Sequence, residues 1–218
     1  MHIPDGFLDP LVAGLFWLGS AVTIGLAVRY ARSELGDERT PLLGVVAAGI
    51  FAAQMLNWPI PGGTSAHFVG GAFAGILLGP SLGVLAMTAV VTIQALVFGD
   101  GGIIALGGNL FAIAVVNVLI GYGLFRMFRE IHESGAAFIA GWAAVTLSAL
   151  IVALGVGFSS AFAYEIGTTV TIMTGGHAVL GIIEGAITAG VYTYIAAARP
   201  DLVFTQFENS NLSPDVKL

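Results

Sequence analysis

Long apolar stretches dominate the chain, and short polar or Gly/Pro-rich segments separate them. Several stretches are close to the roughly 20 residues that an α-helix needs to cross the hydrocarbon core of a bilayer. Two of them, the second and the third, are shorter. The pattern predicts seven membrane-spanning helices at about residues 8–28, 41–57, 65–79, 81–98, 104–125, 136–160 and 172–198.

The connections between these stretches contain residues that end helices. Pro59 and Pro61 follow the second stretch, and Gly79-Pro80 divides the third from the fourth. Proline removes a backbone donor and clashes with the preceding turn, so a helix rarely continues through such segments. We therefore expect 65–79 and 81–98 to be two separate spans.

The basic residues predict the orientation of the chain. All seven fall in the connections after spans one, five and seven, which lie on one side of the membrane: Arg29, Arg32, Arg39, Arg126, Arg129, Arg199 and Lys217. Basic residues concentrate in cytoplasmic loops. The N-terminus is then outside and the C-terminus is cytoplasmic, whereas six spans would break this agreement. The first span lacks a preceding basic region and is expected to be retained rather than cleaved as a signal peptide.

Composition supports the membrane assignment. The chain is 57% hydrophobic and 9% charged, against about 25% charged residues in soluble domains, and its mean hydropathy is +0.95. We predict an all-α integral membrane protein with one seven-helix domain at 1–202 and a polar cytoplasmic tail at 203–218. The absence of cysteine excludes thiolate metal sites, and the absence of a basic patch argues against nucleic-acid binding.

Motifs for common enzyme chemistry are missing. The sequence contains no Walker A motif, which excludes ATP binding through a P-loop. It also lacks the G-x-S-x-G and H-E-x-x-H patterns of hydrolases. We therefore expect the chain not to be an enzyme. Chemistry must come from the polar residues that the predicted topology places toward the outer side: His2, Asp5, Asp9, Asn57, Thr64, Ser65, His67, Asp100, Asn109, Glu165, His177 and Glu184.

The N-terminus offers a chelating group. The α-amine of Met1, the Met1–His2 amide nitrogen and the His2 imidazole can close fused five- and six-membered rings on a metal ion. Ni²⁺ and Cu²⁺ displace the amide proton readily and Co²⁺ less so, and a fourth nitrogen would complete a tetragonal set. The alternative is an ordinary exposed terminal histidine.

His67 is the candidate for the fourth nitrogen. With Thr64 or Ser65 as N-cap, it would lie in or near the first turn of the third span, at the outer mouth of the bundle. Ionisable residues at membrane depth usually line a site rather than face lipid. An interfacial histidine bonded to a loop carbonyl is the alternative. His132 lies among cytoplasmic charges and is expected to be solvated.

Further polar residues are candidates for supporting or pathway roles. His177 and Glu184 lie seven residues apart, on about the same face of the last span. A buried carboxylate needs a partner, so Glu184 is either a structural clamp or a ligand, and Gln94 and Asn57 are possible partners. Asp100 either makes a tight turn or accepts a bond from a metal-bound imidazole.

Several short segments, in order along residues 1–202, form a recognisable set of motifs. They are Met1-His-Ile-Pro-Asp-Gly-Phe-Leu8, Thr40-Pro-Leu-Leu-Gly44, Phe51-Ala-Ala-Gln-Met-Leu-Asn57, Pro61-Gly-Gly-Thr-Ser-Ala-His67, Gln94-Ala-Leu-Val-Phe-Gly-Asp-Gly-Gly102, Gly176-His-Ala-Val-Leu-Gly-Ile-Ile-Glu-Gly-Ala-Ile-Thr188 and Arg199-Pro-Asp-Leu202. Together they resemble a known family, the cobalt/nickel substrate-specific components CbiM and NikM of energy-coupling-factor ABC transporters.

The resemblance implies a function, a fold and partners. Such proteins capture Co²⁺ or Ni²⁺ from outside the cell membrane and need no other cofactor. Their metal is held by groups matched here by Met1, His2 and His67. Their fold is a six-helix core plus an extra N-terminal helix. They work with a coupling transmembrane T component, two ATPase subunits and often a small accessory membrane protein.

Two questions stay open at the level of sequence. A different function, that of an autonomous ion-coupled carrier or channel, could use His177 and Glu184 as a cation or proton path. The choice between cobalt and nickel is not decided, because both metals suit the same motif.

Overall fold

A computed structural model of the chain describes residues 1–36, 39–60 and 64–204. Helices form most of this part of the protein, with one short antiparallel hairpin. In chain order the elements are α1 (Pro10–Glu34), α2 (Arg39–Gln54), β1 (Asn57–Ile60), β2 (Thr64–His67), α3 (Gly71–Phe98), α4 (Leu106–Asn109), the π-helical segment η1 (Leu110–Val116), α5 (Asn117–Phe128), α6 (Glu133–Gly157), α7 (Ile166–Ala198) and the 3-10 turn η2 (Pro200–Leu202).

Five helical runs in the described part are long and apolar enough to cross a membrane. They are α1, α3, the continuous run Leu106–Phe128, α6 and α7, while α2 is a shorter apolar helix. The predicted class, a multi-pass helical membrane protein, is confirmed. The number of long runs is lower than the seven predicted spans for two reasons. Helix α2 is short, and the predicted spans 65–79 and 81–98 are represented by the single helix α3.

The prediction of a helical span at 65–79 is wrong. Residues 64–67 form β2, which pairs with β1 so that Asn57 lies opposite His67. The helix begins only at Gly71, after Gly70 with φ of +77°, so neither Thr64 nor Ser65 caps it. Its first arm, 71–78, has a length of about 12 Å at 1.5 Å per residue, well short of a membrane thickness. An extended segment therefore precedes a short helix where one continuous helix was expected.

The chain reverses direction inside α3, at Gly79. This residue has φ 81° and ψ 171°, and Pro80 follows it. A Cβ added to Gly83 would lie 3.1 Å from the Cα of Gly75. In a straight helix, residues eight apart are separated by about 12 Å. The arms 71–78 and 80–98 therefore lie side by side, and the division predicted at Gly79-Pro80 is present as a tight hairpin between them.

Arg39 and Phe204 contact the apex of this hairpin. Arg39 donates to the carbonyl of Leu78 at 3.0 Å, and its guanidinium carbon lies 4.9 Å from the centre of the Phe204 ring. The same ring packs against Gly79. Val203 and Phe204 are buried, so the first two residues of the predicted tail pack into the bundle. Residues 205–218, the rest of that tail, lie outside the described residues.

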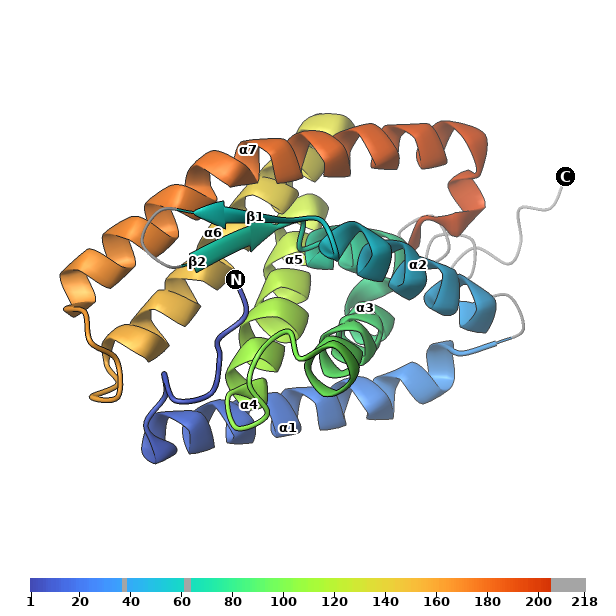
Figure 1. Cartoon of the computed structure of the whole chain (residues 1–218). Coiled ribbons are helices and arrows are strands. Elements are labelled where there is room, and N and C mark those ends of the chain that lie inside the picture. Colours follow the sequence, from blue (N-terminus) through green and yellow to red (C-terminus); the bar gives the residue numbers. More distant parts are fainter. Residues whose placement is uncertain (37–38, 61–63, 205–218) are drawn as a thin grey trace, which may run out of the picture.

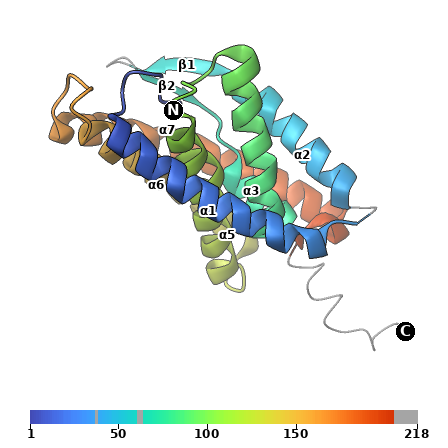
Figure 2. The ribbon, with the colours of Figure 1, turned by 90° about the horizontal axis from the view of Figure 1, so that it is seen from below.

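The outer helices flank a core that is built mainly from α3, α5 and α6. In Figure 1, α1 runs along one side and α7 along the opposite side, and Figure 2 shows α1 crossing the face of the bundle. Helix α1 buries only Ala13, Ser20, Ala27 and Ala31. Its other face exposes large apolar side chains, as expected for contact with lipid: Leu11, Leu15, Leu18, Val22 and Leu26.

Candidate metal centre

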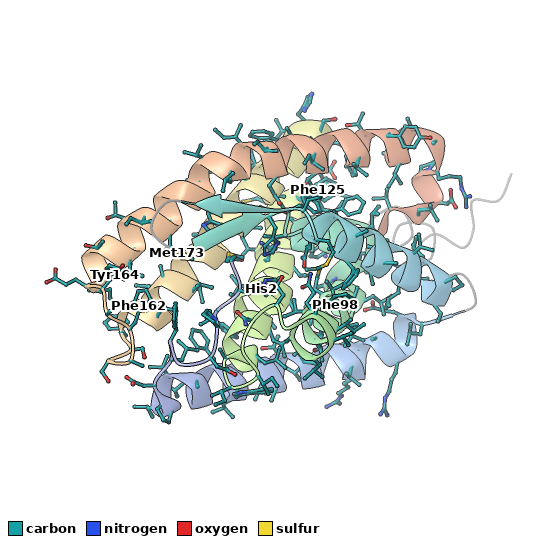
Figure 3. All side chains as sticks on the ribbon, in the orientation of Figure 1. His2, Phe98, Phe125, Phe162, Tyr164 and Met173 are labelled. Carbon is teal, nitrogen blue, oxygen red and sulfur yellow. The ribbon has the colours of Figure 1, made fainter. Side chains whose placement is uncertain are left out.

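The N-terminal segment 1–9 folds back into the bundle instead of projecting from it. Met1 and Ile3 are only 1% and 2% exposed. The chain end lies beside the β-hairpin in Figure 1, and Figure 3 shows His2 in the interior. The side chain of His2 is only 4% exposed, which excludes an ordinary exposed terminal histidine.

Asn109 anchors this segment at Ile3. The Ile3 N–H donates to Asn109 Oδ1 at 2.7 Å, and Asn109 Nδ2 donates to the Ile3 carbonyl at 3.0 Å. The N–H of Gly102 donates to the same carbonyl at 2.9 Å. Asn109 is fully buried and directly precedes the π-helical segment, a deviation often found at functional sites. One side-chain amide thus pairs with the peptide groups of the residue next to His2.

Two carboxylates of the same segment accept hydrogen bonds from loop residues. Asp5 accepts hydrogen bonds from the backbone N–H groups of Ile103, Ile104 and Ala105 at 2.8–3.0 Å. Asp9 accepts from the N–H and the hydroxyl of Ser160 at 2.7 and 3.0 Å. The segment is therefore tied to the loop after α3 and to the loop after α6.

The two candidate imidazoles meet at the end of this segment. The rings of His2 and His67 stack with centroids 4.9 Å apart and an interplanar angle of 14°. The Nδ1 of His67 lies 2.7 Å from the carbonyl oxygen of Phe68. Because a carbonyl can only accept, Nδ1 carries the proton and Nε2 keeps its lone pair. That Nε2 is buried and has no hydrogen-bond partner among the described residues.

Asp100 and Gln94 complete the surroundings of His2. The Oδ1 of Asp100 lies 3.2 Å from His2 Nδ1, and the carboxamide of Gln94 is fully buried with no hydrogen-bond partner among the described residues. The six-membered chelate ring described above uses Nδ1. Metal binding in that mode therefore requires the His2 ring to turn about its Cβ–Cγ bond or to part from Asp100.

Burial keeps the candidate donors uncharged. It lowers the pKa of the Met1 amine to about 5, against the opposing attraction of Asp100. Burial is also the largest cause of the lowered pKa of His2 and of the strongly lowered pKa of His67. The pKa of Asp100 is lowered chiefly by its hydrogen bond with His2. At neutral pH the pocket thus combines nitrogen lone pairs with one ionised carboxylate, which suits a cation.

Side chains alone do not assemble a metal site. In the part of the chain with assigned positions, no three His, Cys, Asp or Glu residues come together around one point. A centre at His2 and His67 needs additional donors from the backbone. The α-amine of Met1 and the amide nitrogen of His2 are of the required type.

The two candidates from the last span, Glu184 and His177, bond to backbone groups. Glu184 accepts from the N–H groups of Val69 and Gly70 at 2.9 and 2.8 Å, which agrees with its interpretation as a structural clamp. The Nδ1 of His177 lies 2.8 Å from the carbonyl of Met173, one turn earlier in α7. His132 caps α6, because its Nδ1 accepts from the Gly135 N–H at 2.8 Å.

The sequence pattern placed Asn109 and Asp5 on the outer side but gave them no role. An Asn inside an apolar stretch is costly in a membrane and is the signal that could have identified the anchor. Its partner, Ile3, carries no polar side chain, so nothing in the sequence marked the pair. Gln54, buried in α2 and bonded to the Val69 carbonyl, was missed for the same reason.

Comparison with known proteins gives the family. Residues 2–202 match the family model of CbiM, described as the cobalt uptake substrate-specific transmembrane region. The chain belongs to the CbiM family. It is 56% identical to a protein of Archaeoglobus fulgidus named as a fused nickel transport protein NikMN, over 93% of this chain and 68% of that protein. It is 32% identical to the cobalt transport protein CbiM of Sorangium cellulosum, over 93% and 94% of the two chains.

A solved structure shares the fold of this CbiM family member. The crystal structure of a truncated transition metal transporter superposes with a TM-score of 0.86 and 31% sequence identity, covering 91% of this chain and 99% of that one. The resemblance inferred from the N-terminal and His67 segments is thereby confirmed. The relatives named here are transport proteins rather than enzymes.

Proposed function

We propose that the chain is the substrate-binding membrane subunit of an ATP-driven importer of Co²⁺ or Ni²⁺. The observation that carries this proposal is the burial of the N-terminal segment, which brings Met1 and His2 against His67. The metal would be held by the Met1 amine, the His2 amide nitrogen, the His2 imidazole and the His67 imidazole. Membership of the CbiM family supports the class of substrate.

The proposed orientation has this centre on the outer side of the cell membrane. Arg39 contacts the apex of the α3 hairpin, and the second arm leads from that apex to Asp100 beside His2. The centre and Arg39 therefore lie at opposite ends of the second arm of α3. Since basic residues favour the cytoplasm, the centre would face the side from which the metal arrives.

The metal is Co²⁺ or Ni²⁺ in this proposal. Four nitrogen donors in one plane favour Ni²⁺ or Cu²⁺. The relatives named above include both a nickel and a cobalt transport protein. We therefore propose one centre whose chemistry accepts both ions.

The energy for import would come from other subunits, because this sequence contains no P-loop. By the resemblance stated above, the partners would be a coupling transmembrane T component and two ATPase subunits, joined in many such transporters by a small accessory membrane protein. The complex would lie in the cytoplasmic membrane. A carrier that works alone through His177 and Glu184 is less well supported, because Glu184 already accepts two backbone hydrogen bonds.

The direct test is Ni²⁺ and Co²⁺ binding by the purified protein with and without an extension of several His-free residues before Met1, long enough to keep the new terminal amine out of the chelate. The extension converts the amine into an amide and breaks the chelate, so tight binding should be lost. His67→Ala should also lose it, and His132→Ala, far along the chain in the α5–α6 connection, should not. Unchanged affinity after extension would contradict the proposed donor set. Metal uptake in cells that lack the ATPase partners would favour the autonomous carrier.

A further inference from the structure

His67, the proposed metal ligand, precedes a stretch of irregular backbone inside the bundle. Strand β2 ends at His67 and α3 begins at Gly71. Val69 and Gly70, between them, are buried. In a membrane protein, non-helical backbone at depth persists only where other groups satisfy its N–H and C=O groups. The partners of this stretch therefore decide where it lies.

Side chains from three other helices supply those partners. Glu184 of α7 uses one carboxylate oxygen for the Val69 N–H at 2.9 Å and the other for the Gly70 N–H at 2.8 Å. Gln54 of α2 donates to the Val69 carbonyl. Asn117 of α5 accepts from the N–H of Ala72 at 2.9 Å. All three side chains are buried.

The position of the His67 ring follows from this backbone. Its Nδ1 is bonded to the carbonyl of the next residue, Phe68, so the ring is fixed to the same peptide stretch that Glu184 holds. The other nitrogen, Nε2, is buried and has no hydrogen-bond partner among the described residues, in a ring that stacks on that of His2. A shift of residues 68–70 would move Nε2 relative to the chelate of Met1 and His2.

We propose that Glu184 is a positioning residue of the metal centre, which sets the place of His67 Nε2 through the backbone of Val69 and Gly70. The proposal rests on the proposed function, because it assigns a role within the same site. Glu184 does not contact the ion. Residues that orient a metal ligand typically change metal affinity about 10- to 100-fold when they are replaced.

The test is a double-mutant cycle on Ni²⁺ affinity with Glu184→Gln and His67→Ala. The glutamine keeps the shape of the side chain but turns an N–H donor toward a backbone N–H. Glu184→Gln alone should raise the Kd about 10- to 100-fold. In the His67→Ala background it should add less than about twofold, because the ligand that it positions is gone.

Thr188→Val is the matched control. Thr188 is one turn further along α7 and fully buried, and its hydroxyl has no hydrogen-bond partner within the described ranges, so its replacement should leave the Kd unchanged. If Glu184→Gln does not fold, Gln54→Met tests the same stretch from α2, with the same expected dependence on His67.

Two outcomes overturn the inference. One is an unchanged Kd in Glu184→Gln, and the other is an equal loss of affinity with and without His67. Either can occur while the wild-type protein binds Ni²⁺ tightly, and the proposed function would then stand. A wild-type protein that binds neither Ni²⁺ nor Co²⁺ would overturn the proposed function itself.

Discussion

The anchoring of the N-terminal segment by Asn109 makes a prediction that does not depend on metal. Asn109→Leu keeps the approximate size of the side chain and removes both hydrogen bonds to Ile3. The Ile3 carbonyl retains the bond from the Gly102 N–H. The Ile3 N–H loses its acceptor while it stays buried. The substitution should therefore favour states in which segment 1–9 has left the bundle.

The magnitude follows from the cost of an unsatisfied buried donor, about 1–3 kcal/mol. Since about 1.4 kcal/mol corresponds to a factor of ten, the open population of the segment should rise about 5- to 140-fold. Hydrogen–deuterium exchange of the segment in the metal-free protein measures this population, because local opening controls exchange of its amides. Exchange of residues 3–9 should accelerate by that factor.

Ser20→Ala is the matched control for this experiment. The Ser20 hydroxyl is buried and donates to the Gly107 carbonyl at 2.7 Å, so its removal also costs one hydrogen bond between α1 and α4. Among the described residues, the Ser20 hydroxyl bonds to Gly107 and not to segment 1–9, so exchange of that segment should stay within about twofold. Wild-type exchange rates in Asn109→Leu would refute the anchoring argument, as would equal acceleration in Ser20→Ala.

Three further predictions concern the pocket and the α3 hairpin. Because burial lowers the pKa of the Met1 amine to about 5 and lowers those of both imidazoles, these donors are uncharged at neutral pH. Only the amide proton then leaves on binding, so calorimetry should find about one proton released per Ni²⁺ and a tenfold gain in affinity per pH unit. Asp100→Asn removes the charge beside His2 and should raise the Kd about 10-fold. Gly79→Ala forces a side chain into positive φ and within 2.7 Å of the Phe204 ring, and should lower the free energy of unfolding by about 1–3 kcal/mol; Gly123→Ala, with open space around it, should not.

Each of these has an outcome that would contradict it. Release of two or more protons would mean that the amine is solvated and charged before binding, and release of none would exclude the amide as a donor. Wild-type affinity in Asp100→Asn would show that the carboxylate does not influence the centre. Equal stability of Gly79→Ala and Gly123→Ala in thermal unfolding would show that the α3 hairpin tolerates a side chain at its apex.

Hydropathy predicted most helices because each apolar run had to be long enough to cross lipid. It failed at residues 65–70, which were predicted to begin a helical span but form the end of strand β2 and then irregular backbone. That stretch is stable because Glu184, 115 positions from Val69 along the chain, accepts its N–H groups. Local pattern contains no information on such a distant partner, so the β-hairpin and the late start of α3 were not predictable.

The candidate site was also predicted only in part. His2 and His67 were identified from residue type, position and family resemblance, and the structure brings their rings together. The groups that hold them in place were not identified. Asn109 bonds to the backbone of Ile3, and Glu184 bonds to the backbone of Val69 and Gly70. Such contacts depend on chain geometry rather than on the partner's residue type.

The central claim is that the N-terminus and His67 together form a four-nitrogen metal centre. X-ray absorption spectroscopy of the Ni²⁺-loaded protein tests it most directly, because it reports the donor atoms and the number of imidazole rings. The account predicts a planar set of four nitrogen donors with two imidazoles in the wild type, and one imidazole in His67→Ala. An oxygen-rich six-coordinate ion, or an imidazole count that does not change in His67→Ala, would contradict it.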